Sequence, residues 1–344
     1  MSPRRARATV QYEECGMKRL LLAAAFTALA LRHRFGRRYS LAGKHVLISG
    51  GSRGLGLALA REMARRGAKL TLLARDLAEL ETAASTLRQT GAEVRVLQAD
   101  VTTHELEAAM ARAAQGHGTL DVLVNVAGVI QAGPLANQEL IDYQEAMAVN
   151  FFAPLRAMQA ARVHLRRSRG RILNVASVGG KVGIPHLPGY SASKFALVGL
   201  GQAWRAELAA EGITLTTACP GLMQTGSARN VTVKGQHAAE YALFATLDNL
   251  PGLSMGADEA ARRMTDALER GDAEAVIGGP ARMLVLAQAL APQLTADLMA
   301  LATRLLPAAG PDNSSRLGKQ LETALTRANP LKRRSEAEYN ELQT

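Results

Sequence analysis

The sequence predicts an α/β fold with a doubly wound parallel sheet of about seven strands. Two observations carry this prediction. Short, continuously apolar runs alternate with helical stretches from Lys44 onward, and a glycine-rich loop joins the first apolar run to the first helix. Continuous apolar runs indicate strands that are buried on both faces. The helices between them are the crossovers that parallel strands require.

The expected strands and helices alternate along the chain. The strands are expected at 44–49, 69–74, 93–99, 120–127, 170–177, 213–220 and 274–279. The helices are expected at 55–66, 77–89, 103–114, 141–167, 191–210 and 257–269. Segment 221–256 is rich in Gly, Asn and Thr and is too long for an ordinary connection, so we expect an irregular functional lid there.

The chain divides into a sheet domain and three flanking regions. We expect a basic leader at 1–40, the sheet domain at 41–280, an apolar helical extension at 281–309 and a loosely ordered polar tail at 310–344. Pro292 is expected to split the extension into two helices.

The distribution of charge argues against nucleic-acid binding. The net charge is +11, but the first 40 residues carry nine Lys/Arg and two Glu, which leaves only 32 basic and 28 acidic residues in the other 304. A nucleic-acid-binding protein would carry its positive charge on the folded body. The two cysteines, Cys15 and Cys219, offer no disulfide framework, so the sequence favours a reducing, cytoplasmic location.

The leader holds a short apolar run at 20–31, bracketed by Lys18 and Arg19 on one side and Arg32 and Arg34 on the other. Its length falls short of the roughly 20 residues of a spanning helix. No convincing cleavage site follows it, so we do not expect a removed export signal. A peripheral membrane contact through 20–31 and a disordered basic leader with one short helix both remain open. Met17 is an alternative start of the chain.

The glycine-rich loop predicts a dinucleotide site. Its spacing is Gly50-x3-Gly54-x-Gly56, between a strand and a helix. Gly50 would allow the tight turn, Gly54 would let the backbone approach a pyrophosphate, and Gly56 would let the helix pack closely. The helix N-terminus offers free N–H groups to phosphates. A purely structural glycine turn is the alternative.

Further motifs follow in a fixed order after the loop. They are "NVAG" at 125–128, Asn150 in "AVN", Ser177 in "NVASVGG", Tyr190 and Lys194 in "YSASK", and "CPG" at 219–221 with Thr225 shortly after. This ordered set resembles the short-chain dehydrogenase/reductase family over about 41–280, which implies a Rossmann-type fold. Val126 departs from the family's Asn-Asn-Ala-Gly motif, where a second Asn stands.

The resemblance implies a nicotinamide cofactor, and two arginines favour NADP(H). The second strand ends Leu73-Ala74-Arg75, without the acid that would bind a ribose 2′-hydroxyl. Arg53 and Arg75 would face a 2′-phosphate; the alternative is that both are merely exposed surface residues. Asp76 is expected to cap the next helix. The family implies these cofactor-binding residues: Gly50, Ser52, Arg53, Gly54, Leu55, Gly56, Arg75, Asp100, Val101, Asn125, Ala127, Gly128, Tyr190, Lys194, Pro220, Gly221 and Thr225.

Tyr190 and Lys194 lie four residues apart, on one face of an expected helix. We expect the ammonium group to lower the pKa of the tyrosine, which would then act as general acid or base. The resemblance implies that Ser177 polarises the carbonyl and that Asn150 holds a water that relays protons to Lys194. His33 and His186 form no metal constellation, and Cys219 is expected in the core, so no metal is implied.

The sequence therefore predicts an NADP(H)-dependent oxidoreductase that acts on CH–OH groups and interconverts a ketone or aldehyde with an alcohol. The small-molecule substrate is expected to be apolar, and the protein is expected to form a homo-oligomer. Two alternatives remain open. One is a membrane-associated reductase of lipid ketones, of 3-oxoacyl or ketosphinganine type. The other is a catalytically silent dinucleotide-binding sensor or scaffold.

Overall fold

The computed structural model describes residues 38–323, 326 and 329–340. The chain from Ser40 onward forms one compact unit. The predictions about the basic leader, its apolar run 20–31 and the alternative start at Met17 lie outside the described residues. Within the described chain, no helix combines the length and apolar character that a bilayer crossing requires.

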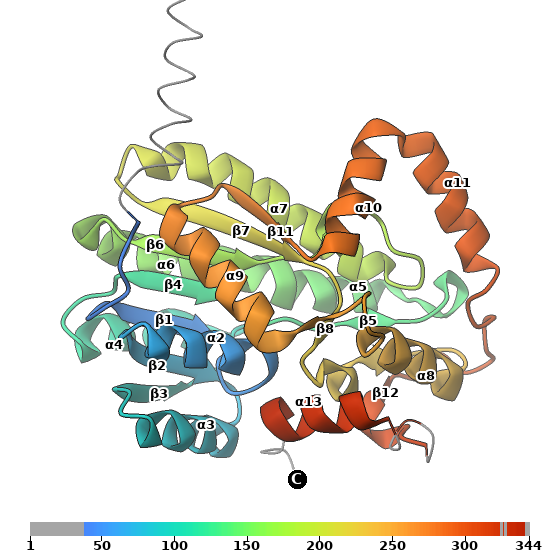
Figure 1. Cartoon of the computed structure of the whole chain (residues 1–344), viewed down its shortest axis with the longest axis horizontal. Helices are drawn as coiled ribbons and strands as arrows, with labels where there is room; N and C mark the ends of the chain where they lie inside the picture. The colour runs from blue at the N-terminus through green and yellow to red at the C-terminus, as the bar shows by residue number, and fades with distance from the viewer. Residues whose placement is uncertain (1–37, 324–325, 327–328, 341–344) are drawn as a thin grey trace, which may run out of the picture. The chain divides into compact units, whose positions relative to one another are not determined.

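The centre of the fold is a sheet of seven parallel strands in the order β11-β7-β6-β4-β1-β2-β3 (Figure 1). The strands are β1 (His45–Ser49), β2 (Lys69–Ala74), β3 (Val94–Gln98), β4 (Val122–Asn125), β6 (Arg171–Val175), β7 (Thr214–Pro220) and β11 (Glu274–Ile277). The α/β class and the number of strands are confirmed. The chain winds outward on both sides of β1, and the reversal between β1 and β4 marks where open sheets of this kind bind ligands.

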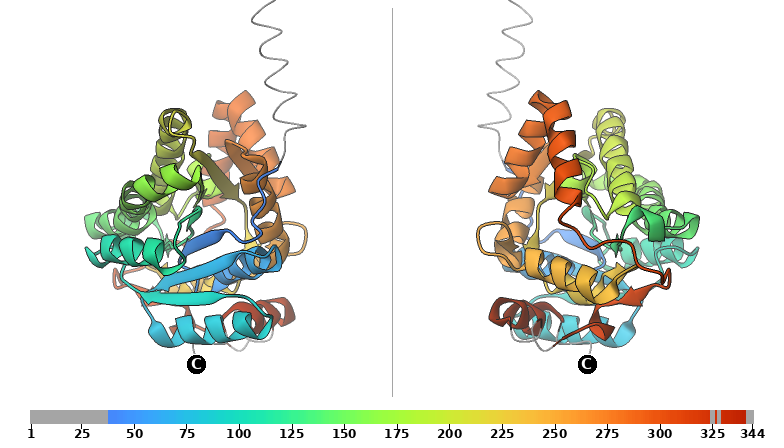
Figure 2. Two further views of the ribbon diagram at one scale, coloured as in Figure 1. Left: turned by 90° about the vertical axis from the view of Figure 1, so that its left-hand side faces the viewer. Right: turned by 90° about the vertical axis from the view of Figure 1, so that its right-hand side faces the viewer.

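Helices cover both faces of the sheet (Figures 1 and 2). Helices α2 (Gly54–Arg65), α3 (Leu77–Gln89) and α9 (Ala257–Arg270) pack on one face. Helices α4 (Glu105–Gly116), α6 (Ala153–Ser168) and α7 (Pro188–Ala209) share the main core cluster with the other face. The sequence explains the start of α3, because the Asp76 side chain accepts a hydrogen bond from the Glu79 amide as an N-cap.

The expected long helix 141–167 is divided. It consists of α5 (Leu140–Met147), a π-helical turn η2 (Ala148–Phe152) and then α6. A single π turn inserted between α-helices is often found at a functional site, and this one contains Asn150.

The prediction of an irregular lid at 221–256 is wrong in part. The segment holds α8 (His237–Asp248), the 3-10 turn η4 (Ser227–Asn230) and the short strands β8 (Met223–Gln224), β9 (Thr232–Val233) and β10 (Met255–Gly256). Tyr241 and Ala245 on α8 are buried against Val231 and Val233 in a separate core cluster. This burial orders a segment whose polar composition suggested a loop.

The predicted break of the apolar extension at Pro292 is confirmed, since α10 (Gly279–Leu290) ends there and α11 (Pro292–Thr303) begins. The prediction of a loosely ordered tail is wrong for its described part. That part forms β12 (Arg316–Leu317), the 3-10 turn η5 (Gly318–Gln320) and α13 (Pro330–Asn340). Strand β12 completes a small sheet with β9 and β5 (Gln131–Ala132), and α13 packs against α2 and β8.

Candidate active site

The glycine loop has the backbone that the sequence predicted. Gly50 has φ +90°, and a Cβ there would lie 2.6 Å from the Ala127 amide nitrogen. Gly54 has φ +55°, so it also lies in the left-handed region that favours glycine. A Cβ on Gly56 would lie 1.8 Å from the carbonyl oxygen of Gly50, so α2 packs directly on the loop that leaves β1. The loop opens onto a cavity of about 1500 Å³.

Most of the predicted site residues line this one cavity. It contains the predicted glycines of the loop and Ser52, Arg53, Leu55, Arg75, Asp100, Val101, Ala127, Gly128, Ser177, Tyr190, Lys194, Pro220, Gly221 and Thr225. Asn125 and Asn150 do not line it. Asn125 is buried at the end of β4 and donates a hydrogen bond to Asn174 at 2.9 Å, so its side chain ties two strands together.

The arginine of the glycine loop already has a partner. Arg53 Nη1 lies 2.9 Å from Glu79 Oε1, and Ser52 Oγ donates to Glu79 Oε2 at 3.0 Å. Arg75, by contrast, is an exposed cation that follows β2. Burial acts to raise the pKa of the nearby Asp100 carboxyl, but hydrogen bonds from Thr102 and then the charge of Arg75 lower this pKa below its usual value. Of the two arginines expected to face a 2′-phosphate, Arg53 is therefore ion-paired with Glu79, and Arg75 is exposed.

Ser177, Tyr190 and Lys194 meet on the cavity wall. Ser177 follows β6, and its Oγ accepts a hydrogen bond from the Gly179 amide at 3.0 Å. A Cβ on Gly179 would lie 3.3 Å from the Tyr190 ring and 3.5 Å from Ser177 Oγ, which shows how closely the two side chains approach. Lys194 Nζ donates to the Val175 carbonyl at 3.0 Å and lies 5.7 Å from the centre of the Tyr190 ring.

The electrostatics of this group differ from the sequence-based expectation. Burial raises the pKa of Tyr190 to about 12, even though a hydrogen bond with Ser177 lowers it. Burial also lowers the pKa of Lys194 to about 8. Removal from water disfavours the charged form of each group, so in this structure the expected lowering of the Tyr190 pKa by Lys194 does not occur.

Asn150 lies behind Lys194 and outside the cavity wall. It is fully buried; its Oδ1 accepts from the Val129 amide, and its Nδ2 donates to the Val129 carbonyl and to Ser193 Oγ, each at 3.0 Å. A Cβ on Gly128 would lie 3.0 Å from Asn150 Oδ1 and 3.5 Å from Lys194 Nζ, so both polar groups converge on this glycine. Local hydrogen bonds and the π turn thus fix the Asn150 side chain close to the lysine.

Sequence reasoning missed several polar residues of the cavity wall: Glu79, Glu240, Asp248 and Asn340. It considered His186, which also lines the wall, only as a metal ligand; its Nδ1 lies 2.7 Å from Glu240 Oε1, and its φ is +62°. Burial raises the pKa of Asp248 to about 7. Only Glu79 carried a readable signal, because Asp76-x-x-Glu79 matches a helix-capping pattern.

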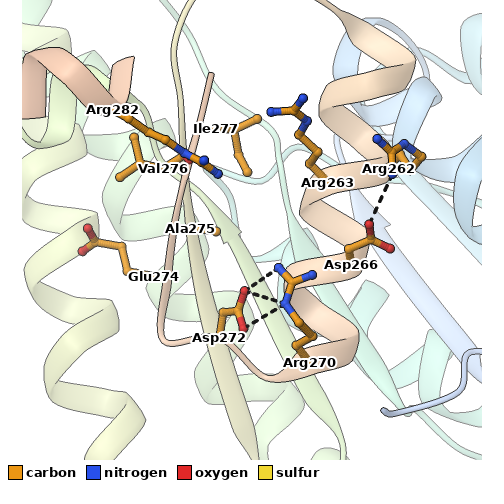
Figure 3. Close-up of a pocket in the computed structure, with 10 residues that line it drawn as sticks. All are labelled: Arg262, Arg263, Asp266, Arg270, Asp272, Glu274, Ala275, Val276, Ile277 and Arg282. Carbon is orange, nitrogen blue, oxygen red and sulfur yellow. Dashed lines mark hydrogen bonds and ion pairs between the residues drawn. The ribbon is translucent and has the colours of Figure 1, made fainter. Parts of the chain in front are cut away.

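A second, smaller hollow of about 480 Å³ lies beside β11 and α9 (Figure 3). Two of its four arginines pair with carboxylates of the same wall: Arg262 lies 3.6 Å from Asp266 Oδ2, and Arg270 lies 2.6 Å from Asp272 Oδ2. It contains no residue of the glycine loop or of the Ser177, Tyr190 and Lys194 group. The larger cavity is therefore the candidate active site. Cys219 is buried, and burial raises the pKa of its thiol to about 12, as expected for a core position.

Comparison with known proteins identifies the class of this fold and site. The family model for short chain dehydrogenases matches residues 44–235, which span β1 to just beyond β9. The chain belongs to the short chain dehydrogenase family, whose members are oxidoreductases that bind a nicotinamide dinucleotide.

Among curated relatives, the chain is 39% identical over 189 residues to granaticin polyketide synthase putative ketoacyl reductase 1 of Streptomyces violaceoruber, covering 54% of this chain and 70% of the relative. It is 37% identical over 189 residues to a putative ketoacyl reductase of Streptomyces coelicolor, covering 54% of this chain and 72% of the relative. Both matches cover little more than half of this chain.

Solved structures agree on the fold. A short chain dehydrogenase/reductase from Burkholderia phymatum in complex with NAD superposes with a TM-score of 0.68 at 25% identity, covering 74% of this chain and 96% of that one. A dehydrogenase/reductase from Sinorhizobium meliloti 1021 gives a TM-score of 0.62 at 32% identity, covering 70% and 96%.

Proposed function

We propose that the protein is an NADP(H)-dependent ketoreductase that interconverts a ketone or aldehyde with an alcohol by hydride transfer. One observation carries the proposal. Ser177, Tyr190 and Lys194 line the same cavity as the glycine loop, so a proton donor and a dinucleotide cradle face one space. The named ketoacyl reductases among the relatives support the ketone as the reacting group.

The residues present fit a dinucleotide. Gly50 and Gly54 have positive φ, and Gly56 has no side chain. The backbone of this loop can therefore approach a pyrophosphate at the N-terminus of α2. Arg75 and the paired Arg53 would face the adenosine end, beside Asp100 and Val101. Ala127, Gly128, Pro220, Gly221 and Thr225 would hold the nicotinamide half. When bound, NADPH supplies the hydride, and the protein supplies orientation and proton transfer.

The proton chemistry falls to Tyr190. With its raised pKa the phenol stays protonated at neutral pH, as a general acid toward a carbonyl oxygen requires. Ser177, which is hydrogen-bonded to Tyr190, would hold the same oxygen. Lys194 would bind the nicotinamide ribose and return a proton toward Tyr190. Asn150, held at Gly128 beside the lysine, would position the water that connects Lys194 to solvent.

We propose an apolar substrate. Beyond Tyr190 the cavity wall is formed largely by apolar side chains from α8, α10 and α11 and the loops between them, with Leu243, Phe244, Leu247, Leu284 and Leu306 among them. The few polar groups on this side, such as the His186 and Glu240 pair, would orient the substrate, while the apolar side chains would make most of the contacts with it.

The outer face of the α10–α11 hairpin favours a second candidate, a membrane-associated reductase of lipid ketones. Its exposed apolar side chains are Met283, Leu286, Leu290, Leu294, Leu298 and Leu301. Such a face can bury itself in a lipid surface or against a second subunit. We propose that the protein is a cytoplasmic homo-oligomer whose catalytic domain spans 41–280. Only if the substrate is a lipid ketone do we propose a peripheral membrane contact through the hairpin and residues 20–31.

A panel of carbonyl compounds tests the function. It should include simple apolar ketones, a 3-oxoacyl thioester and a long-chain lipid ketone, each followed by loss of NADPH absorbance. We expect turnover with at least one apolar ketone and none for Tyr190→Phe. Binding of NADPH without turnover of any compound would favour the catalytically silent sensor or scaffold. Turnover restricted to lipid ketones would favour the membrane-associated reductase.

A further inference from the structure

The C-terminal helix α13 lies against the segment that carries Thr225. This helix follows residue 235, where the family match ends, so that match does not include it. It contacts α2, whose N-terminus would face the proposed dinucleotide, and β8, which precedes Thr225. In Figure 1, α13 lies at the lower edge of the view, to the right of α3.

Asn340 makes the contact with this segment. It has no exposed surface in the described structure, yet it borders the cavity. Its Nδ2 donates to the carbonyl oxygen of Thr225 at 2.6 Å, and its Oδ1 accepts from Asn230 Nδ2 at 3.4 Å. A single side chain from α13 therefore holds both ends of the segment 225–230.

The Thr225 carbonyl stands opposite the glycine loop. For a Cβ built on Gly54, the nearest atom other than its chain neighbours and the backbone of its own helix is Thr225 O, at 4.0 Å. The Thr225 carbonyl therefore borders the part of the cavity that the glycine loop also lines, where the pyrophosphate would lie. A carbonyl oxygen that faces a phosphate repels it, and an amide donor on that oxygen offsets part of this repulsion.

The fit between α13 and the segment is close. Gly226 has φ +69°, and a Cβ there would lie 2.4 Å from Asn340 Nδ2 and 3.0 Å from Glu336 Cα. A glycine at position 226 is thus favoured for two reasons. Its backbone is in the left-handed region, and a side chain there would collide with α13.

Helix α13 is fastened independently to α2. Arg61 Nη2 donates to the Glu338 carbonyl at 2.9 Å, and its guanidinium carbon lies 5.2 Å from the centre of the Tyr339 ring. Tyr339 is buried. Because α2 also carries the glycine loop at its N-terminus, α13 links the loop's helix to the Thr225 segment across the site.

We propose that Asn340 is a positioning residue for dinucleotide binding, holding the Thr225 carbonyl at a fixed distance from Gly54. The inference rests on the proposed dinucleotide site and extends it to the C-terminal helix. Pre-positioning of the segment lowers the ordering cost of binding, so Asn340 acts on affinity for the dinucleotide and leaves the chemical step alone.

The test uses the full chain and three variants. Asn340→Leu keeps the approximate volume and removes the donor. Asn340→Asp keeps the shape and places an acceptor against the Thr225 carbonyl. Arg334→Gln, at an exposed position on the same helix, is the matched control. For each we would measure Kd for NADPH by calorimetry, kcat for the best ketone at saturating NADPH, and the melting temperature.

For Asn340→Leu we expect Kd to rise about five- to tenfold, the effect of one lost hydrogen bond, with kcat within twofold of the parent chain. Asn340→Asp should weaken binding further, and Arg334→Gln should change neither quantity. Amide hydrogen exchange at 225–230 should also become faster in Asn340→Leu. If the leucine variant does not fold, Arg61→Leu serves in its place, since it loosens α13 without touching Thr225.

Two failures are distinguishable. If the parent chain binds NADPH but Asn340→Leu changes Kd by less than twofold while the melting temperature falls, α13 is a structural support only and the positioning role is wrong. If the parent chain binds neither NADPH nor NADH, the proposed function itself fails, and the role of Asn340 fails with it.

Discussion

Arg53 and Glu79 form an ion pair at the mouth of the dinucleotide cavity, with Nη1 and Oε1 2.9 Å apart. Glu79 is nearly buried and also accepts the Ser52 hydroxyl. The carboxylate neutralises part of the charge that would otherwise meet a 2′-phosphate. Under the proposed preference for NADP(H), the exposed Arg75 that follows β2 would therefore carry most of the discrimination between the two cofactors.

The first prediction concerns this discrimination. NADPH should bind more tightly than NADH by about 1.5–3 kcal/mol, the scale of one charged hydrogen bond. Arg75→Ala should remove most of the difference, and Arg53→Ala a smaller part. Glu79→Gln should increase the preference, because it frees the Arg53 charge. Calorimetric titration with both dinucleotides measures each value, and equal affinity of the parent chain for NADPH and NADH would refute the assignment.

The second prediction separates proton donation from binding. Tyr190→Phe removes only the hydroxyl, so NADPH binding should stay nearly intact while the rate of ketone reduction falls by about two to four orders of magnitude. Lys194→Met should weaken both, because the lysine is proposed to bind the ribose and to feed the proton path. Single-turnover absorbance and calorimetry report the two effects. Substantial turnover by Tyr190→Phe would require another acid in the cavity.

The third prediction concerns pH. In the proposed mechanism Lys194 works in its protonated form. Burial lowers the pKa of Lys194 to about 8 and raises that of Tyr190 to about 12. The kcat/KM for ketone reduction should be level below pH 8 and fall as pH rises through about 8, because Lys194 loses its proton there first. A pH–rate profile measured with a stable ketone checks this. A profile that stays level beyond pH 10 would show that kcat/KM does not depend on the protonation of Lys194.

The sequence identified the parts of the site that depend on local patterns. Strand, loop and helix around Gly50 and Gly54 are contiguous, so their geometry follows from glycine's permitted φ values. Tyr190 and Lys194 are one helical turn apart, so their common face follows from helix periodicity. The apolar runs likewise predicted all seven strands, because a doubly covered sheet leaves little room for polar residues.

What the sequence could not show are contacts between distant segments. Glu79 reaches Arg53 across 26 positions, and Asn340 reaches Thr225 across 115. No local pattern marks either pair. The raised pKa of Tyr190 was missed for the same reason, since desolvation depends on what covers the hydroxyl, whereas the neighbouring lysine can be read from spacing. Polar composition also misled at 310–344, where burial of a few side chains orders α13.

The fourth prediction concerns stability away from the site. His45 is buried at the start of β1, hydrogen-bonded to Thr71 Oγ1 at 2.8 Å and to the Thr119 carbonyl, and burial lowers its pKa from 6.5 to about 4. The unfolded chain therefore binds a proton below pH 6.5 that the folded chain does not accept until about pH 4. Stability should be fully present above pH 6.5 and decline as pH falls toward 4, by up to about 3 kcal/mol.

Urea unfolding of the parent chain and of His45→Gln at pH 7.5 and pH 4.5 tests this. The glutamine variant should lose less stability than the parent between these two pH values. His104→Gln, at an exposed position, should lose as much as the parent. Identical pH dependence of the parent and His45→Gln would show that His45 titrates normally in the folded protein.

The fifth prediction contrasts two glycines in helices. Gly56→Ala would place Cβ 1.8 Å from the Gly50 carbonyl oxygen, and backbone on both sides leaves nothing flexible to yield. We expect it to lower the free energy of unfolding by about 1–3 kcal/mol and to abolish dinucleotide binding, because the loop must shift. Gly199→Ala, within α7, meets nothing within 4 Å and should stabilise the protein by about 0.5–1 kcal/mol. Urea unfolding and NADPH calorimetry on both variants separate close packing at the loop from ordinary helix propensity. An alanine at position 56 that left both quantities unchanged would mean that α2 does not lie against the Gly50 carbonyl.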